Sequence, residues 1–308
     1  NHSGIMNINQ FNDYKKLMKI REGKEWDKTE GIELNANELN SIIASNPLSK
    51  CNRELSETIP IKPLKEIIFN KFISTQEAFG KIMNEIGKVN NSFTNRIITT
   101  SPDVTVSTSL GGWVNKKNIF STHKKTDIFG EKKVFSSQKW KYVPDGQHIE
   151  LGIAENNLFL LLASLGISDK LFGKRILPVG TIYDTFIGRG LDALNYATYI
   201  DARFILVGTP SGVTLSHEGG AHQSILTPNI GISQPNLTYY EPSYADELEF
   251  LFFWGLEYMQ KKDGSSIYFR LSTKKLIQPK RKLSQKNKQN IVKGCYWLHK
   301  PETSQPII

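Results

Sequence analysis

The sequence contains few cysteines. Only two of its 308 residues are cysteine, Cys51 and Cys295, and neither belongs to a short motif such as C-x-x-C. A disulfide framework or a zinc site needs several thiols at close or regular spacing. We therefore expect neither, and we assign no chemical role to these two residues.

Long apolar runs and targeting signals are also missing. A helix needs about 18 consecutive apolar residues to span a bilayer, and the sequence contains no such run. The first residues lack the basic and then apolar pattern of a secretory signal. We therefore expect a cytoplasmic protein without a membrane partner.

The sequence has fewer acidic than basic residues, which gives a formal charge of +9 at pH 7. Clustered Lys and Arg can neutralise nucleic-acid phosphates. Much of the excess, however, lies between Lys274 and Lys288, where Pro279 and polar residues predict a solvated linker. No nucleic-acid recognition motif accompanies the charge, so we expect no nucleic-acid partner.

Local patterns divide the chain into three parts. Residues 1–73 alternate short helical patterns with Asn, Ser and Pro, which predicts an extended connector. Ser74 and Glu77 fit a capping box, so a helix and a compact domain should begin there and extend to about 275. Residues 276–308 predict a linker and the start of a further domain. Both ends look truncated, because the sequence begins without Met and stops soon after a new apolar stretch.

Strand-like apolar runs alternate with helical patterns through the middle of the chain. Strands separated by helices predict an α/β fold, with a mostly parallel sheet covered by helices on both faces. Ligand sites in such sheets lie at the carboxyl ends of the strands. The charged stretch from Asn115 to Asp145 predicts a long loop. The expected strands are 103–107, 176–183, 203–207 and 267–271, and the expected helices are 150–165, one from 186 onward, and 245–260.

The most informative stretch is G-Q-H-I-E-L-G-I-A-E-N-N-L-F-L-L-L-A-S-L-G, from Gly146 to Gly166. Glu155 lies on an apolar stripe in which residues recur at spacings of three and four. Its carboxylate should therefore point inward or into an interface. Because an unpaired buried carboxylate is costly, Glu155 should have a definite partner. The spacing leaves open whether that partner is a structural Arg, a neighbouring loop or a ligand. The stripe comprises Leu151, Ala154, Leu158, Leu162 and Leu165.

Three blocks resemble the thiamine diphosphate enzymes of the transketolase superfamily. G-I-A-E before an apolar helix is similar to the signature that presents a glutamate to the aminopyrimidine of the cofactor. I-Y-D-T-F-I-G-R-G, from Ile182 to Gly190, and S-H-E-G-G-A-H-Q-S, from Ser216 to Ser224, resemble the next two blocks. Three blocks in order are a stronger signal than any one alone. The stretch T-S-P-D-V-T-V-S-T-S-L-G-G-W most resembles the homodimeric pyruvate dehydrogenase decarboxylating component.

The resemblance implies roles for individual residues. Glu155 would bond to the pyrimidine ring nitrogen and favour the imino tautomer, which then acts as an internal base. Phe186 would stack on the aminopyrimidine, a contact worth about 1 kcal/mol beyond its buried area. His222 would exchange protons beside the substrate. The remaining implied positions are Tyr183 and Asp103 near the cofactor, and Arg189, Glu218 and His2 near the substrate.

Each of these positions also has a structural interpretation. Tyr183 and Phe186 could be core aromatics at a strand-to-helix turn, and Arg189 could be a surface charge. Asp103 could cap a turn. His222 could be a histidine that only makes a structural hydrogen bond.

The resemblance further implies cofactors and partners. Thiamine diphosphate and Mg²⁺ are expected, with the metal ligands in a missing upstream domain, because the Gly-Asp-Gly motif of the family is absent here. The implied reaction is decarboxylation of pyruvate by a homodimer, which passes the acyl unit to a lipoyl-bearing acyltransferase.

Two alternatives to this function stay open. One is a transketolase that moves two-carbon ketol units between sugar phosphates. It is modestly disfavoured because Glu218 stands where the sugar-phosphate enzymes carry Asp. The other is an isolated domain that is inactive and only self-associates, because the family builds each site between domains of two subunits.

Overall fold

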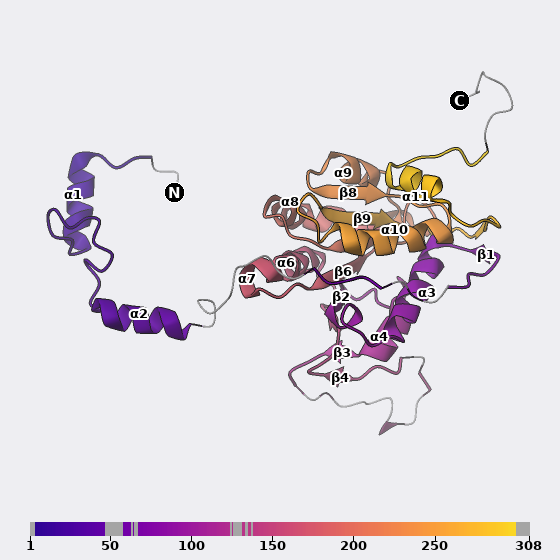
Figure 1. Cartoon of the computed structure of the whole chain (residues 1–308), viewed down its shortest axis with the longest axis horizontal. Helices are drawn as coiled ribbons and strands as arrows, with labels where there is room; N and C mark the ends of the chain where they lie inside the picture. Colours follow the sequence, from indigo (N-terminus) through magenta and orange to yellow (C-terminus); the bar gives the residue numbers. More distant parts are fainter. Residues whose placement is uncertain are drawn as a thin grey trace, which may run out of the picture. The chain divides into compact units, whose positions relative to one another are not determined.

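The protein is described by a computed structural model, and its chain forms two compact units, Asn1–Glu54 and Leu55–Ile308 (Figure 1). The domain limits expected at 73 and 275 stay predictions. His2 lies outside the described residues. The structure describes residues 4–46, 58–62, 64, 67–123, 125, 131–132, 135–136 and 138–299.

The first unit contains two short helices, α1 (Ile8–Leu17) and α2 (Ala36–Ser45). Asn7 and Asn35 cap them, each by accepting a backbone hydrogen bond from the first turn. Neither helix buries any of its residues. Side-chain burial therefore contributes little to the stability of either helix.

The second unit is built on a sheet with the strand order β4-β3-β5-β2-β6-β7-β9-β8. Every pairing of this sheet within the described residues is parallel. The α/β fold expected from the sequence is therefore confirmed. The strands are β2 (Ile97–Ser101), β3 (Ile119–Phe120), β4 (Tyr142–Val143), β5 (His148–Glu150), β6 (Leu177–Ile182), β7 (Ile205–Gly208), β8 (Leu237–Tyr240) and β9 (Ser266–Arg270).

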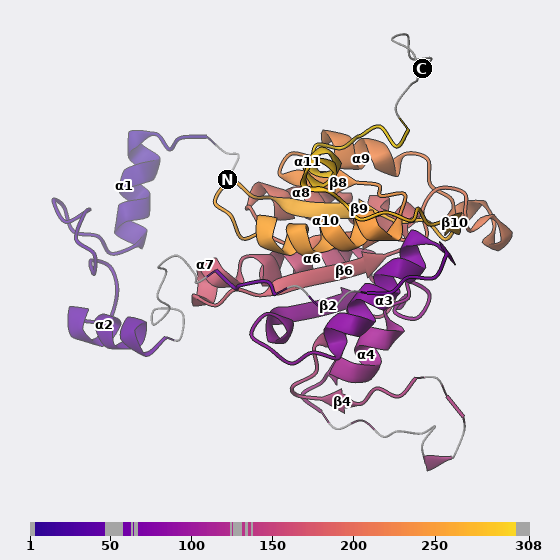
Figure 2. The ribbon, with the colours of Figure 1, turned by 45° about the vertical axis from the view of Figure 1, so that its right-hand side comes forward.

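Helices cover both faces of this sheet, as Figures 1 and 2 show. Successive strand residues point to opposite faces, so Ile205 and Val207 join one core cluster while Leu206 joins the other. The first cluster lies under α3 (Thr75–Gly87), α4 (Gly111–Lys117) and α10 (Ala245–Tyr258). The second lies under α6 (Glu155–Gly166), α8 (Leu191–Tyr199) and α9 (Thr227–Ser233).

Smaller elements complete the unit. β1 (Phe72–Ile73) pairs antiparallel with β10 (Leu276–Ile277), and α11 (Gln285–Val292) packs on α10. The others are α7 (Ser168–Phe172) and the 3₁₀ helices η2 (Thr94–Arg96), η3 (Asp184–Gly190), η4 (Ser216–Glu218) and η5 (Gly220–His222).

Helix α3 begins where the sequence predicts. The Ser74 side chain accepts a hydrogen bond from the Glu77 backbone N–H, and the Glu77 carboxylate accepts one from the Ser74 backbone N–H. The predicted capping box is therefore confirmed. The predicted strand at 176–183 and helix at 245–260 are also present as β6 and α10.

Some predicted boundaries near the ends of the strands are wrong. The strand expected at 103–107 does not form, because β2 ends at Ser101, Pro102 lacks a backbone N–H, and Asp103 has a positive φ of 65°. The helix expected from 150 begins five residues later, because Glu150 still belongs to β5 and Gly152 turns the chain with a φ of 67°. The helix expected from Phe186 begins after η3, at the start of α8.

Two segments expected to be irregular contain ordered elements. The predicted loop at 115–145 holds the end of α4 and the paired strands β3 and β4. The predicted solvated linker at 274–288 holds β10, and Arg281 within it donates from Nε to the Asp246 carboxylate at 2.7 Å. Part of the positive charge in this stretch is therefore neutralised by carboxylates of α10.

Candidate functional site

A cavity of about 250 Å³ lies at the carboxyl ends of β2 and β6, the place where a parallel sheet presents its sites. Every predicted site residue except His2 lines this cavity, although their roles stay predictions. The lining also contains four residues that the sequence did not suggest. The predicted lining residues are Asp103, Glu155, Tyr183, Phe186, Arg189, Glu218 and His222, and the additional ones are Pro102, Val104, Ile153 and Ile182.

Glu155 enters the cavity from the first residue of α6. The positive end of the helix dipole favours a carboxylate at this position. The residue is only 8% exposed, as the apolar stripe predicted. Its Oε1 accepts a hydrogen bond from Arg189 Nη1 at 2.6 Å. The definite partner expected for Glu155 is therefore an arginine of the site itself.

Arg189 makes a second contact inside the cavity. Its guanidinium carbon lies 3.9 Å from the centre of the Phe186 ring, a cation–π distance. The guanidinium thus donates to a carboxylate and lies over an aromatic face, while 55% of the side chain remains exposed. This position accommodates a flat group that carries N–H donors.

Three rings form the wall beside this position. Tyr183 and Phe186 are stacked at a centroid distance of 6.0 Å. His222 meets Phe186 edge-on at 5.5 Å and Tyr183 at 5.8 Å. The aromatic residues therefore orient an imidazole toward the same cavity.

One ring nitrogen of His222 makes no hydrogen bond within the described part of the chain. Its Nδ1 is buried and finds no hydrogen-bond partner among the described residues, and such an atom is a position for a ligand or a water. Its Nε2 lies 4.0 Å from the Glu218 carboxylate. His222 can thus form a hydrogen bond to a bound group through Nδ1, while the Glu218 carboxylate lies beside its other ring nitrogen.

Asp103 lies two residues after the end of β2, and its backbone is held by a chain of hydrogen-bonded polar groups. Its backbone N–H donates to Glu150 Oε1 at 2.8 Å, and Thr105 donates to the other oxygen of Glu150 at 2.8 Å. His148 is fully buried and bonds through its two nitrogens to Thr105 at 3.0 Å and Thr99 at 2.9 Å. His148 does not line the cavity, so its interactions support the strand ends.

Burial acts to raise the pKa of Glu150, but hydrogen bonds from His148, Thr105 and the Asp103 backbone outweigh it and hold that pKa below its ordinary value. Glu150 was not predictable as a site-supporting residue, because a charged residue at the end of a strand is common. Its role depends on contacts with Asp103 and Thr105, which follow the neighbouring strand β2 and are distant from Glu150 in the sequence.

Another group missed from the sequence lies directly under the site. Asp184, in η3, is fully buried and accepts hydrogen bonds from Tyr268, Ser224, Thr227 and Arg270. Arg270 at the end of the apolar strand β9 could have indicated this contact in the sequence, because a buried arginine requires an acidic partner.

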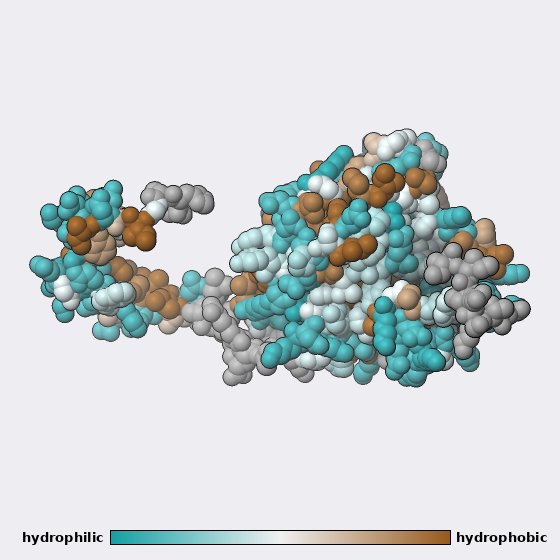
Figure 3. All heavy atoms as spheres, turned by 90° about the horizontal axis from the view of Figure 1, so that it is seen from above, coloured by the Kyte–Doolittle hydropathy of each residue, from teal (hydrophilic) through white to brown (hydrophobic). Residues whose placement is uncertain are grey.

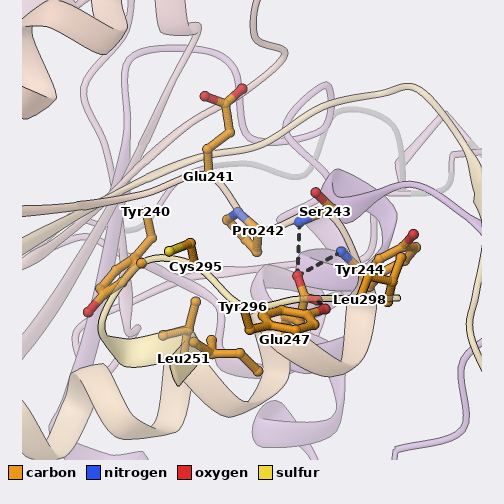
Figure 4. A pocket seen from close by; sticks show the side chains of 12 residues that line it. Tyr240, Glu241, Pro242, Ser243, Tyr244, Glu247, Leu251, Cys295, Tyr296 and Leu298 are labelled. Atoms are coloured by element: carbon orange, nitrogen blue, oxygen red, sulfur yellow. Dashed lines mark hydrogen bonds between the residues drawn. The ribbon is translucent and has the colours of Figure 1, made fainter. Parts of the chain in front are cut away.

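A separate cavity of about 300 Å³ lies between β8, α10 and the segment after α11 (Figure 4). There the Glu247 carboxylate accepts hydrogen bonds from the backbone N–H groups of Ser243 and Tyr244, at 3.1 and 3.3 Å. The same carboxylate also binds Arg281 at 2.7 Å. Because Glu247 is satisfied by these partners and none of the predicted site residues lines this cavity, the candidate site is the first cavity.

The described ranges contain neither a cluster of metal ligands nor a membrane-spanning helix. No three His, Cys, Asp or Glu side chains gather there as a metal ion would require. None of the helices in the described parts combines the length and hydropathy needed to cross a bilayer. The expectation that Mg²⁺ is bound by another domain stays a prediction.

The chain is similar to several known proteins. The family model for the pyruvate dehydrogenase E1 component middle domain matches residues 69–275. The pyruvate dehydrogenase E1 component of Pseudomonas aeruginosa is 25% identical over 260 residues, which cover 80% of this chain and 28% of that protein. A 1-deoxy-D-xylulose-5-phosphate synthase of a Cyanothece species is 29% identical over 124 residues, which cover 40% of this chain and 18% of that protein.

Solved structures are similar in fold. A transketolase of Pichia stipitis matches with a TM-score of 0.57 at 15% sequence identity, covering 96% of this chain and 36% of the transketolase. At this identity the match supports the fold alone. The chain spans less than a third of the length of the two curated relatives.

Proposed function

Because the chain belongs to the family of the pyruvate dehydrogenase E1 component middle domain, among the thiamine diphosphate enzymes of the transketolase-like superfamily, we propose that it forms the pyrimidine-binding part of a pyruvate-decarboxylating enzyme. One observation carries the proposal. A buried carboxylate and an aromatic face, Glu155 and Phe186, converge on the flat guanidinium of Arg189. An aminopyrimidine ring offers the same two features, in-plane nitrogens and a face for stacking.

The residues present fit such a ring. The Arg189 guanidinium is a natural stand-in for it, because both are flat and both present nitrogen to a carboxylate. Its 55% exposure leaves it free to move aside. The diphosphate would lie outside the cavity, since the lining contains Arg189 as its one basic side chain, apart from the imidazole of His222.

When bound, thiamine diphosphate would supply the acidic thiazolium carbon that the decarboxylation of a 2-oxo acid requires. Glu155 holds and exchanges a proton at the pyrimidine nitrogen. Phe186, backed by Tyr183, orients the ring by stacking. His222 moves a proton beside the substrate through its unpartnered Nδ1. Asp103 bounds the site next to the ring.

Two residues would face the substrate. Arg189, once displaced from Glu155, is positioned to bind the carboxylate of a 2-oxo acid. Glu218, whose carboxylate lies 4.0 Å from His222 Nε2, would contact the substrate beside the imidazole. A sugar-phosphate substrate is less well supported, because Glu218 stands where the sugar-phosphate enzymes carry Asp and the contact to a ketose hydroxyl is therefore in doubt.

The proposed setting of this site includes groups beyond the described residues. It comprises Mg²⁺ bound by another domain, a second copy in a homodimer, and a lipoyl-bearing acyltransferase that takes the acyl unit. A cytoplasmic location and the role of His2 near the substrate also remain proposals.

Turnover by the natural full-length protein that contains this sequence tests the reaction. We expect pyruvate-dependent reduction of an electron acceptor that requires thiamine diphosphate and magnesium. Transfer of ketol units between sugar phosphates, without activity on pyruvate, would instead establish the transketolase alternative.

The isolated 308-residue chain is expected to behave differently, because it would supply only part of a shared site. We expect weak cofactor binding and no turnover, with self-association as its main property. Calorimetry in the presence of magnesium measures this directly, and a micromolar dissociation constant would contradict the expectation.

A further inference from the structure

The buried carboxylate of Asp184 joins two segments that carry the candidate site. It is fully buried in η3, next to Tyr183 and two residues before Phe186. One of its oxygens accepts a hydrogen bond from Tyr268. The other accepts hydrogen bonds from Arg270 Nε at 3.1 Å and from Thr227 at 2.6 Å, as well as from Ser224.

Two of these donors come from the segment that follows His222. Ser224 lies two residues after the imidazole, and Thr227 begins α9. A further bond runs in the same direction, because Thr185 donates to the Gln223 carbonyl at 3.0 Å. The loop that carries Glu218 and His222 is thus tied at its base to the segment that carries Phe186 and Arg189.

Arg270, the last residue of β9, contacts both Asp184 and the segment after His222. Besides its bond to Asp184, it donates from Nη2 to the Ser224 carbonyl at 3.2 Å and from Nη1 to Glu241 at 2.6 Å. A buried carboxylate whose donors are all charged or hydroxyl groups is held firmly, since losing one partner leaves a costly unsatisfied group. The two site segments therefore share one rigid anchor.

We propose that Asp184 is a positioning residue, which sets the His222 imidazole against the rings of Phe186 and Tyr183. It does not line the cavity, so it acts only through the residues that do. This role concerns the site of the proposed function. The contacts that produce it lie within the chain, so it requires no bound cofactor.

The test is the substitution Asp184→Asn, which keeps the shape and removes the charge and one acceptor. Carbon-13 labelling of Cε1 of the histidine ring gives at most six signals, one for each histidine, and His222→Gln assigns the relevant one. The rings at 5.5 and 5.8 Å shift the His222 resonances through their ring currents. We expect Asp184→Asn to move this signal toward that of the exposed His299.

Glu247→Gln is the matched control. Glu247 is also a buried carboxylate bound to an arginine and a tyrosine, Arg281 and Tyr296, but it lies in the cavity of Figure 4. The Glu247→Gln substitution should lower the stability of the chain as Asp184→Asn does, and it should leave the chemical shift of His222 unchanged. An unchanged His222 signal in Asp184→Asn, or an equal shift in both variants, overturns the proposal.

A milder variant guards against loss of folding. Thr227→Val removes one hydroxyl donor to Asp184 and keeps the side-chain shape. We expect a smaller shift of the His222 signal in the same direction, and no shift would again overturn the proposal. Because these spectra are recorded without cofactor, failure of thiamine diphosphate to bind would refute the proposed function and leave the role of Asp184 standing.

Discussion

Arg189 makes two contacts that a ring bound in the same place would also need. It donates to Glu155 at 2.6 Å and lies 3.9 Å from the centre of Phe186. A partly exposed ion pair and a cation–π contact are each worth about 0.5–1 kcal/mol. Any flat ligand must therefore displace the arginine before it can bind.

Arg189→Ala should tighten binding of thiamine to the chain by about tenfold, because about 1.4 kcal/mol of competing contacts disappears. Titrations followed by ligand NMR measure the change. Arg203→Ala is the control, since Arg203 pairs with Asp201 at 2.8 Å outside the cavity and should leave binding unchanged. Weaker binding by the Arg189 variant would contradict the displacement.

The low pKa of Glu150 predicts how its contribution to stability depends on pH. Because the pKa is lower in the folded chain than in the unfolded chain, the ionised carboxylate stabilises the fold above the ordinary value of 4.5. This contribution is lost as the pH falls through the lowered pKa.

Glu150→Gln should accordingly lower the free energy of unfolding at neutral pH, and the difference from wild type should shrink as the pH falls below the ordinary value. Urea unfolding at a series of pH values provides the measurement. A difference that stays constant, or grows in acid, would show that the carboxylate does not stabilise the strand ends through its charge.

At the scale of the elements, η3 and the start of α8 pack closely on α6. A Cβ atom at Gly190 would lie 2.3 Å from Cδ2 of the buried Phe159, whereas at Gly188 it would meet nothing within 4 Å. Overpacking of this kind costs about 1–3 kcal/mol.

Gly190→Ala should therefore lower the free energy of unfolding by about 1–3 kcal/mol, and Gly188→Ala should have little effect. Both substitutions lie in the same segment, so chemical denaturation of the pair separates the packing of η3 on α6 from general effects on the backbone. Equal stability of the two variants would count against this contact.

The regular elements of the sheet were predictable because each has a local cause. A short run of residues that can be buried on both faces specifies β6, and Ser74 with Glu77 specifies the start of α3. The β-branched residues at 103–107 favour a strand. That strand does not form, because Pro102 and the positive φ of Asp103 end β2 before it. At this position the backbone conformation outweighed the strand propensity of the side chains.

The site was predictable only in part for a similar reason. Three sequence blocks suggested Glu155, Phe186 and His222, and the fold brings them to one cavity. The pairing of Asp184 with Arg270 depends on contacts between residues 86 apart in the chain. No periodicity or short motif carries such information.

At the scale of the whole molecule, the exposed apolar side chains bear on association. Figure 3 shows apolar residues among polar ones on the face seen from above. On α6, Leu160 is 49% exposed, and on α8 Tyr196 and Tyr199 are 61% and 81% exposed. These residues lie on α6, whose first residue Glu155 lines the site, and on α8, which packs against α6; this suits the proposed contact with a second copy.

Sedimentation should therefore detect dimers of the chain at high concentration. Leu160→Glu should weaken the dimer, because it places a charge on this exposed face without touching the core. Ile277→Glu, at an exposed apolar position of β10 away from α6 and α8, provides the control. A monomer at all concentrations would contradict the proposed association.

The most direct measurement of the central claim is saturation-transfer NMR on the chain with thiamine diphosphate, because this method detects weak binding. We predict transfer to the pyrimidine protons of the ligand, lost in Phe186→Ala and reduced in Glu155→Gln. Absence of transfer to those protons, or transfer unaffected by both substitutions, would show that the cavity between Glu155 and Phe186 does not bind the ring.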